Sequence, residues 1–265
     1  MKIKVVSIIV CIALILVSLA SCNSSASKIK AEEDLKNKKI GVIASTKSDV
    51  FASKYTQNGC EILKYSSYIG LEKALEAGEI DCAVMDENTA KARAKQGAEI
   101  KIVEQAIGQD TLTFVTAESK RVYNVMLNKA LESLTADGTI DEIINAYLED
   151  NNYVYEYAEN TDESNGSFTI VIDPAQVPYV FPSDETREKP GGINLALIDA
   201  ICSSLGCGYT LLPLSGESLA SSLRMGIADF AIGSFDLENT DQEGVELLME
   251  STPVLTYNHV IVTKK

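Results

Sequence analysis

Residues 78–86 read Gly78-Glu79-Ile80-Asp81-Cys82-Ala83-Val84-Met85-Asp86, and residues 226–234 echo them as Gly226-Ile227-Ala228-Asp229-Phe230-Ala231-Ile232-Gly233-Ser234. Each stretch follows a segment with apolar residues at helical spacing, and the offset between the copies is constant at 148 residues. The alternation after each glycine is typical of a short strand. We therefore predict one helix–glycine–strand unit in each of two lobes.

The chain begins with the features of an export signal. Lysines near the start precede an apolar run over residues 5–17, which ends in Leu19-Ala20-Ser21-Cys22. Secretory processing recognises this combination of charged start, short apolar core and small residues. We predict a lipoprotein signal peptide over residues 1–21 and a polar tether over 22–34. The Leu-Ala-Ser-Cys sequence resembles the bacterial lipobox, which predicts lipidation of Cys22; an ordinary cleavage site that contains a cysteine is the alternative.

Charge and cysteine content limit the classes of partner. The formal net charge is −15, so a nucleic acid would have to bind against the protein's own field, and we expect none. No CxxC pair is present among the four cysteines that follow Cys22, which argues against zinc. We predict no metal and no cofactor. These cysteines are Cys60, Cys82, Cys202 and Cys207. A disulfide between the last two and buried free thiols both remain open.

The first half contains two candidate binding segments, each at the end of a strand. A buried strand over residues 38–43 runs into a polar turn with Ser45 and Thr46. A helix that starts there would present free N–H groups to an anion, although these side chains, or Ser48, could simply cap the helix. Asp86 ends the next strand, where open α/β sheets bind ligands, and it is equally suited to be an N-cap. Further expected elements are strands at 100–103 and 111–116 and helices at 122–134 and 140–148.

The second half restarts the alternation of strands and helices. After an acidic linker at 151–167, residues 168–172 predict a strand, and a proline-framed loop follows with Tyr179 and Phe181. These aromatic rings could stack on a ligand or pack within their own lobe. The only histidine, His259, lies in an apolar final strand, and no nucleophile motif stands beside a base. We therefore predict that the protein is not an enzyme.

Several motifs together resemble a known family. The motifs are the aromatic loop, the helix start Gly192-Ile193-Asn194, the segment Leu223-Arg224-Met225-Gly226-Ile227-Ala228-Asp229, and Ser251-Thr252-Pro253 before a final strand. With them, residues 168–265 resemble the first lobe of the amino-acid-type (family 3) extracellular solute-binding proteins of ABC importers. The resemblance implies an α/β, two-lobed periplasmic-binding-protein-like fold. Each lobe would be a mixed sheet flanked by helices, with a ligand cleft between the lobes.

The order of the two parts is reversed relative to that family. Residues 33–150 resemble the part that normally follows the first lobe, so the chain resembles a circular permutant; two truncated modules or a swapped dimer are the alternatives. Native termini that lie close together make such a rearrangement physically cheap. The predicted divisions are a lobe-2-like α/β unit at 35–116, helices returning to lobe 1 at 117–150, the linker at 151–167 and a lobe-1-like α/β unit at 168–265.

The resemblance also implies roles for individual residues. Asp86 matches the usual acceptor of the ligand's α-ammonium group, Ser45 and Thr46 match the segment that holds its carboxylate, and Tyr179 and Phe181 sit where aromatic packing is expected. Two further contacts are expected at the end of the echo strand, Ser234 and Asp236. One departure concerns the family's Thr-Pro-Glu-Arg stretch, which is here Glu238-Asn239-Thr240-Asp241. Without that arginine, Lys47 or the helix start would have to hold an anion.

Together these features predict a monomeric solute-binding protein, lipid-anchored through Cys22 on the extracytoplasmic face of the cell membrane. Its ligand would be a small polar solute, an amino acid or a related amine-bearing compound, captured between two lobes and delivered to an ABC permease. Closure about a hinge would couple ligand binding to the permease. The alternative is a ligand-sensing or surface binding module with a degenerate pocket and no role in transport.

Overall fold

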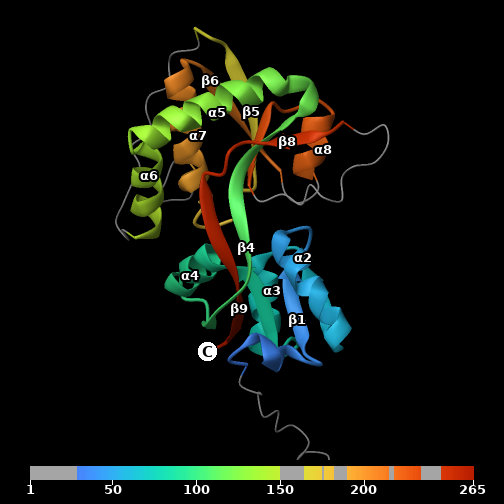
Figure 1. Cartoon of the computed structure of the whole chain (residues 1–265). Coiled ribbons are helices and arrows are strands. Elements are labelled where there is room, and N and C mark those ends of the chain that lie inside the picture. Colours follow the sequence, from blue (N-terminus) through green and yellow to red (C-terminus); the bar gives the residue numbers. More distant parts are fainter. Residues whose placement is uncertain (1–28, 150–163, 175, 182–189, 215–217, 234–245) are drawn as a thin grey trace, which may run out of the picture.

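Two lobes, joined by two long strands, make up the molecule (Figure 1). The computed structural model describes residues 29–149, 164–174, 176–181, 190–214, 218–233 and 246–265. The signal peptide with Cys22, most of the linker, and Ser234 and Asp236 lie outside the described residues. The joining strands are β4 (Ile100–Ala117) and β9 (Leu255–Lys264), which pair antiparallel, and β4 belongs to the sheets of both lobes. Every helix in the described part of the chain is too short or too polar to span a bilayer.

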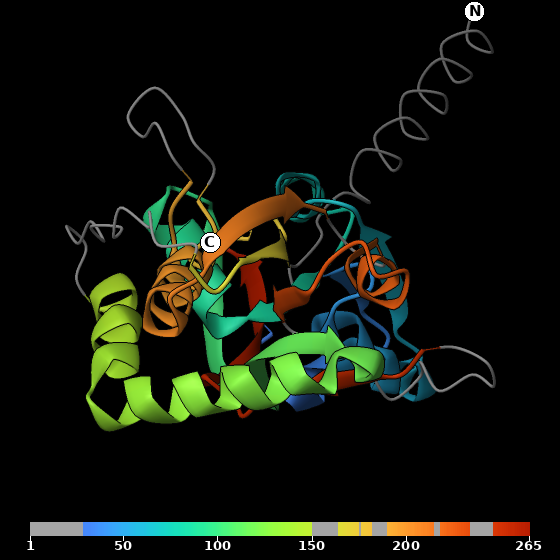
Figure 2. The same cartoon turned by 90° about the horizontal axis from the view of Figure 1, so that it is seen from above.

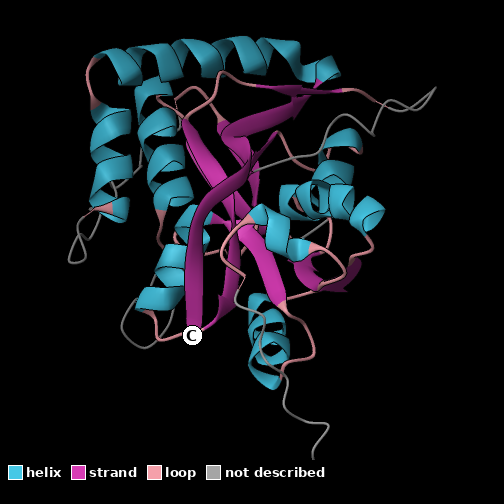
Figure 3. Ribbon diagram, turned by 60° about the horizontal axis from the view of Figure 1, so that its bottom comes forward, coloured by secondary structure: helices cyan, strands magenta, loops and turns pink. Residues whose placement is uncertain are grey.

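The lower lobe is a mixed sheet in the order β2-β1-β3-β9-β4. Its first three strands run parallel and β9 runs antiparallel to β3. Helices and short 3-10 turns cover the sheet on both faces, as Figure 3 shows. The elements are η2 (Glu32–Leu35), β1 (Lys39–Ile43), α2 (Lys47–Ser53), η3 (Lys54–Asn58), β2 (Glu61–Tyr65), α3 (Tyr68–Ala77), β3 (Cys82–Asp86) and α4 (Glu87–Lys95).

The upper lobe is a second mixed sheet in the order β4-β7-β5-β6, with β8 paired to β4. Three of its strands run parallel and β4 runs antiparallel to them. Seen from above, α5 lies across the lobe, with α6 and α7 toward one end and α8 toward the other (Figure 2). The elements are η4 (Glu118–Lys120), α5 (Arg121–Ala136), α6 (Thr139–Leu148), β5 (Ser167–Ile172), α7 (Ile193–Leu205), β6 (Gly208–Pro213), α8 (Ser218–Arg224), β7 (Phe230–Gly233) and β8 (Leu248–Glu250).

Each sheet buries apolar side chains on both of its faces. In the upper lobe Phe114, Ile170 and Phe230 pack under α5, α6 and α7, while Val115 and Val171 face α8. The lower sheet is covered in the same way by α2 on one face and by α3 and α4 on the other. The predicted class, a two-lobed α/β protein with a mixed sheet in each lobe, is confirmed. All four cysteines among the described residues are buried free thiols.

The two sequence repeats form equivalent turns in the two lobes. Gly78 follows α3 with φ 72° and Gly226 follows α8 with φ 70°, a left-handed conformation that glycine adopts without steric cost. The aspartate three residues later then joins the repeat strand to the first strand of its lobe. The Lys39 N–H donates to Asp81 Oδ2 and the Thr169 N–H donates to Asp229 Oδ2, each at 2.8 Å. The predicted helix–glycine–strand units are therefore confirmed, and their aspartates support the sheets.

The strands differ from expectation at β4, at β2 and at β8, the last of which was not expected. The segments 100–103 and 111–116 belong to one 18-residue strand, β4, whose pairing with β9 shifts register between Ile102 and Gly108. The polar residues between them hide the strand in the sequence, because only Ile107 among residues 104–110 is buried and this part of β4 lacks a continuous apolar face. Strand β2 was not expected, and its residues are all partly or fully exposed at the sheet edge, where the apolar pattern is weak.

Candidate functional site

The carboxyl ends of β1 and β3 meet where the lower lobe faces the upper one. Asp86 is the last residue of β3 and is only 4% exposed. Its Oδ1 accepts a hydrogen bond from the Thr89 N–H at 2.8 Å, which makes Asp86 the N-cap of α4. The capping role expected from the sequence is confirmed. This cap also explains why a carboxylate is tolerated there, since helix starts favour negative charge.

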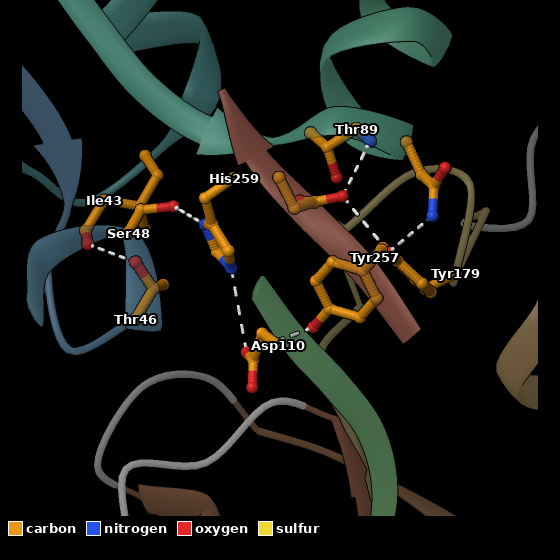
Figure 4. A network of polar contacts seen from close by, with 10 residues as sticks. Ile43, Thr46, Ser48, Thr89, Asp110, Tyr179, Tyr257 and His259 are labelled. Atoms are coloured by element: carbon orange, nitrogen blue, oxygen red, sulfur yellow. Dashed lines mark hydrogen bonds and ion pairs between the residues drawn. The ribbon is translucent and has the colours of Figure 1, made fainter. Parts of the chain in front are cut away.

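Tyr179 of the upper lobe forms a hydrogen bond with the same carboxylate. The Tyr179 hydroxyl donates to Asp86 Oδ1 at 3.1 Å and accepts from Asn88 Nδ2 at 3.2 Å (Figure 4). A second bond crosses between the lobes beside it, because Thr89 Oγ1 donates to the carbonyl of Val177 at 2.8 Å. The first turn of α4 is therefore joined to the loop that follows β5.

The start of α7 fixes the position of Tyr179. The N–H groups of Ile193 and Asn194 donate to the carbonyls of Pro178 and Tyr179 at 3.2 and 2.9 Å. Gly192 has φ 115°, and a Cβ there would lie 2.4 Å from the Tyr179 carbonyl oxygen. Only glycine allows the loop to approach the helix this closely. Since Tyr179 is also 1% exposed, its side chain is held firmly against the lower lobe.

Burial dominates the electrostatics of this contact. It raises the pKa of the Asp86 carboxyl above its ordinary range, while the Thr89 hydrogen bonds, the neighbouring His259 and the Tyr179 hydroxyl act to lower it. Burial and the charge of Asp86 also raise the pKa of the Tyr179 phenol, so the phenol keeps its proton at neutral pH. A charged carboxylate at this place is therefore incompletely compensated, and a cation beside it would be stabilising.

A second buried array lies on the other side of Asp86. His259 pairs with Asp86 across β9 and β3, and its Nδ1 lies 2.9 Å from Ser48 Oγ. Its Nε2 lies 3.7 Å from Asp110 Oδ2, too far for a hydrogen bond, while the Tyr257 hydroxyl donates to the same oxygen at 3.4 Å (Figure 4). The array joins α2 to the two connecting strands.

Serine, histidine and aspartate in a row invite comparison with a hydrolase. Here Ser48 and His259 are 5% and 3% exposed, so a substrate could not reach the hydroxyl without a rearrangement of the lobes. The histidine nitrogen that faces the carboxylate makes no hydrogen bond among the described residues. A nucleophile needs a base that is itself held by a third group. This geometry supports a structural role for Ser48 and His259, whose proximity the sequence did not predict.

The segment before α2 lies at the end of β1, the parallel neighbour of β3. Ser45 has φ 60°, a left-handed conformation that is uncommon for serine and occurs most often at functional sites. Thr46 precedes α2 as its N-cap, but its hydroxyl donates to the Ile43 carbonyl at 2.8 Å and accepts no hydrogen bond from a helix N–H. Lys47 is the first residue of α2. Capping by the Thr46 side chain, one of the open alternatives, is therefore wrong.

The structure separates the other predicted site residues. Phe181 pairs with Gly191 and stacks on Tyr147, with ring centroids 6.4 Å apart, so it packs within the upper lobe. Ser234 and Asp236 lie outside the described residues. No sequence signal pointed to Asn88 or Asp110, because their roles depend on strands and loops far away in the chain. Within the described residues no group of three or more histidine, cysteine or acidic side chains is arranged to hold a metal ion.

Comparison with known proteins gives a partial match to binding proteins. The chain is 28% identical over 127 residues to the histidine-binding periplasmic protein of Escherichia coli K12, covering 44% of this chain and 48% of that protein. It is 27% identical over 124 residues to the histidine-binding periplasmic protein of Salmonella typhimurium LT2, covering 43% and 48%. The chain thus spans about half the length of the curated relatives it matches. No family model matches the chain.

Solved structures were also compared. One example is the ligand-binding component of an ABC-type import system from Staphylococcus aureus, crystallised with zinc bound. It is 13% identical with a TM-score of 0.44, covering 85% of this chain and 65% of that one. Over the matched part, this chain is similar in sequence to the histidine-binding periplasmic proteins.

Proposed function

We propose that this protein captures a small polar solute that bears an amine, an amino acid or a related compound, between its two lobes and delivers it to an ABC permease. The observation that carries the proposal is Asp86, a buried carboxylate at the carboxyl end of β3 that the two lobes share. Binding at a point where both lobes contribute couples occupancy to lobe closure. The names of the curated relatives support an amino acid as the ligand.

In this proposal Asp86 accepts the ammonium group of the solute. Its raised pKa is caused mainly by burial, and a cation would remove that cost. Ser45, Thr46 and Lys47 would contact the opposite, anionic or polar, end of the solute, since they lie at the end of the neighbouring parallel strand. Tyr179 would border the solute from the upper lobe. Phe181, Ser234 and Asp236 complete the predicted set and remain predictions.

We also propose that the protein is anchored to the outer face of the cell membrane by lipid on Cys22. The support is the Leu19-Ala20-Ser21-Cys22 sequence after an apolar run. An anchored, monomeric binding protein would present its solute directly to a permease in the same membrane. Metabolic labelling with a fatty acid, compared between the natural chain and Cys22→Ala, tests this point, and equal labelling would contradict it.

A circular permutation of the family order is part of the same proposal. Strand β9 is antiparallel to β3, and Ala83 of β3 pairs with Gly41 of β1 on one side and Val262 of β9 on the other. The end of β9 therefore lies at the edge where β1 begins, about 10 Å away at two strand spacings. A short connection between these two ends would restore the family order, which supports the permutation.

A ligand panel with a matched pair of variants tests the function. Amino acids, amines and small peptides are screened by thermal shift and then by calorimetry with the full chain. We expect at least one amine-bearing compound to raise Tm, and Asp86→Asn to abolish that shift. Asp81→Asn is the control, because Asp81 belongs to the same repeat but lies at the other end of β3, with its side chain exposed. Equal ligand shifts in both variants, or none with any compound in the natural protein, would contradict the proposal.

A further inference from the structure

The contact between Tyr179 and Asp86 uses the group that the proposed function assigns to the ligand. Asp86 Oδ1 accepts from the Thr89 N–H at 2.8 Å and from the Tyr179 hydroxyl at 3.1 Å, and both side chains are buried. The Thr89 bond belongs to the helix cap and stays within the lower lobe. The Tyr179 bond comes from the upper lobe, so it is the donor that a solute would have to replace.

Asn88 determines which way the phenol hydrogen points. Its Nδ2 lies 3.2 Å from the Tyr179 oxygen and has only hydrogens to offer, so the phenol oxygen accepts that bond. The phenol hydrogen is then free to point at Asp86, 3.1 Å away (Figure 4). Hydrogen bonds linked in this way strengthen one another. Tyr179 is thus oriented as a donor, the role that an ammonium group plays toward a carboxylate.

We propose that the Tyr179 hydroxyl is an internal competitor for Asp86, which latches the two lobes together and yields to a ligand that carries a primary ammonium group. This inference rests on the proposed function, in that Asp86 must be the ligand's acceptor. The competitor lowers the affinity for every solute by the same factor, so only a solute that binds Asp86 strongly is retained. In this proposal Tyr179 weakens ligand binding, whereas the other site residues strengthen it.

The selectivity follows from comparing donors. A solute that offers a neutral hydroxyl exchanges one O–H···carboxylate bond for another and gains nothing from displacing Tyr179. An ammonium group makes a charge-assisted bond, which is roughly twice as strong. It also supplies the positive charge that the buried Asp86 carboxylate lacks. The competitor therefore sets a threshold that amines pass and neutral polar solutes do not.

Loss of the Tyr179 hydroxyl should loosen the lobes without separating their folds. The bond from Thr89 Oγ1 to the Val177 carbonyl crosses between the lobes independently of the Asp86 carboxylate. Strands β4 and β9 also continue through both lobes. A change at Tyr179 is therefore expected to shift the balance between closed and open arrangements and to leave each core intact.

The test compares two tyrosine-to-phenylalanine variants of the full chain. Tyr179→Phe removes the proposed competitor. Tyr209→Phe is the matched control, because the Tyr209 hydroxyl also donates to a buried carboxylate, Asp199 at 3.3 Å, but within the upper lobe. Probes are L-amino acids, each paired with the α-hydroxy acid in which a hydroxyl replaces the ammonium group. Affinities come from calorimetry and the separation of the lobes from small-angle scattering without added probe.

We expect the natural protein and Tyr209→Phe to bind an amino acid with equal affinity and its hydroxy acid more weakly or not at all. Tyr179→Phe should bind both about tenfold more tightly, the value of one hydrogen bond to a charged group, and should have a larger radius of gyration. If Tyr179→Phe binds the probes no more tightly than the natural protein does, the proposal that Tyr179 competes for Asp86 is wrong. If no probe binds any of the proteins, the proposed function fails. The latch is then tested by scattering alone, and a radius of gyration of Tyr179→Phe equal to that of the natural protein would overturn it.

Discussion

The Asp86 carboxylate has to meet three demands, one for each of its roles. It caps α4, it accepts a bond from the upper lobe, and it stands where a ligand's cation is proposed to bind. The first demand is local and could be met by serine or asparagine equally well. A carboxylate is needed only for the proposed binding of a cation, because a buried charge is otherwise a cost. Its titration should therefore be visible in the stability of the protein.

The pH dependence of stability provides a test at Asp86. Burial raises the pKa of this carboxyl in the folded protein. Its protonated form is thus favoured by folding, and that contribution is full at low pH and is lost as the pH rises through the raised pKa. Asp86→Asn keeps an acceptor for the Thr89 N–H but does not titrate. We expect Tm of the natural protein, relative to Asp86→Asn, to fall between about pH 3 and pH 7.

The measurement is a pair of thermal unfolding series over that pH range without added ligand. Asp81→Asn provides the control, because its carboxylate is exposed and belongs to the other end of β3. A difference in Tm between the natural protein and Asp86→Asn that stays constant, or that grows in favour of the natural protein as pH rises, would contradict the prediction.

The aspartates of the two repeats should differ in how much they stabilise the fold. Asp229 bonds to the Thr169 N–H and forms an ion pair with Lys120 Nζ at 2.7 Å, and it is partly buried. Among the described residues, the Asp81 carboxylate accepts a hydrogen bond from the Lys39 N–H alone, at an exposed position. We expect Asp229→Ala to lower the free energy of unfolding by about 2–3 kcal/mol and Asp81→Ala by about 1 kcal/mol. Urea denaturation measures both, and equal losses would contradict this assignment.

At the scale of elements, the start of α7 controls the loop that carries Tyr179. Gly192 combines a φ of 115° with a close approach to the Tyr179 carbonyl. We expect Gly192→Ala to cost at least about 3 kcal/mol, because both the backbone conformation and the approach exclude a Cβ. Gly226→Ala provides the comparison. Its φ is 70° but no atom lies within 4 Å of the added Cβ, so only about 1 kcal/mol is expected.

Chemical denaturation of the two glycine variants gives this comparison directly. Gly192→Ala should also displace Tyr179 from Asp86, since Tyr179 moves with the helix start, and should therefore strengthen ligand binding as Tyr179→Phe does. If Gly192→Ala lowers the free energy of unfolding no more than Gly226→Ala does, the loop accommodates the methyl group by moving away.

At the scale of the whole molecule, β4 and β9 decide how the lobes communicate. They are the central pair of the entire sheet order and carry Asp110 and His259 between the lobes. The irregular register between Ile102 and Gly108 lies on this pair. A bulged strand bends more readily than a regular one. This irregularity lies in the lower lobe, where Val103 and Ile107 are buried in the core.

A rearranged chain tests the proposed permutation. A linker of about six residues joins Lys265 to Lys30, since β9 ends at the edge of the sheet where β1 begins, and new termini are opened between residues 150 and 164. If the family order suits the same fold, the rearranged protein should unfold cooperatively with Tm within a few degrees of the natural chain. Circular dichroism and thermal melting measure this. An aggregated or non-cooperative product would contradict the proposal. The natural chain with the same linker added after Lys265 is the control for effects of the linker itself.

Much of the fold could be predicted from local pattern. The repeats at 78–86 and 226–234 encode a helix end, a left-handed glycine and a strand, each of which depends on neighbouring residues only. The helices at 122–134 and 140–148 follow from apolar spacing in the same way. Strand β2 and the middle of β4 could not be predicted, because neither shows the apolar alternation by which a strand is recognised in a sequence.

The sequence by itself determined the α/β class, two lobes and the place of Asp86 at a strand end, because periodicity and turn chemistry act over a few residues. Only the tertiary structure decided what meets that carboxylate. Tyr179 lies 93 residues away in the chain, and Ser48 and His259 are separated by 211 residues. Such pairings depend on how β4 and β9 carry the chain between the lobes and on how α7 holds its loop, and no local pattern encodes them.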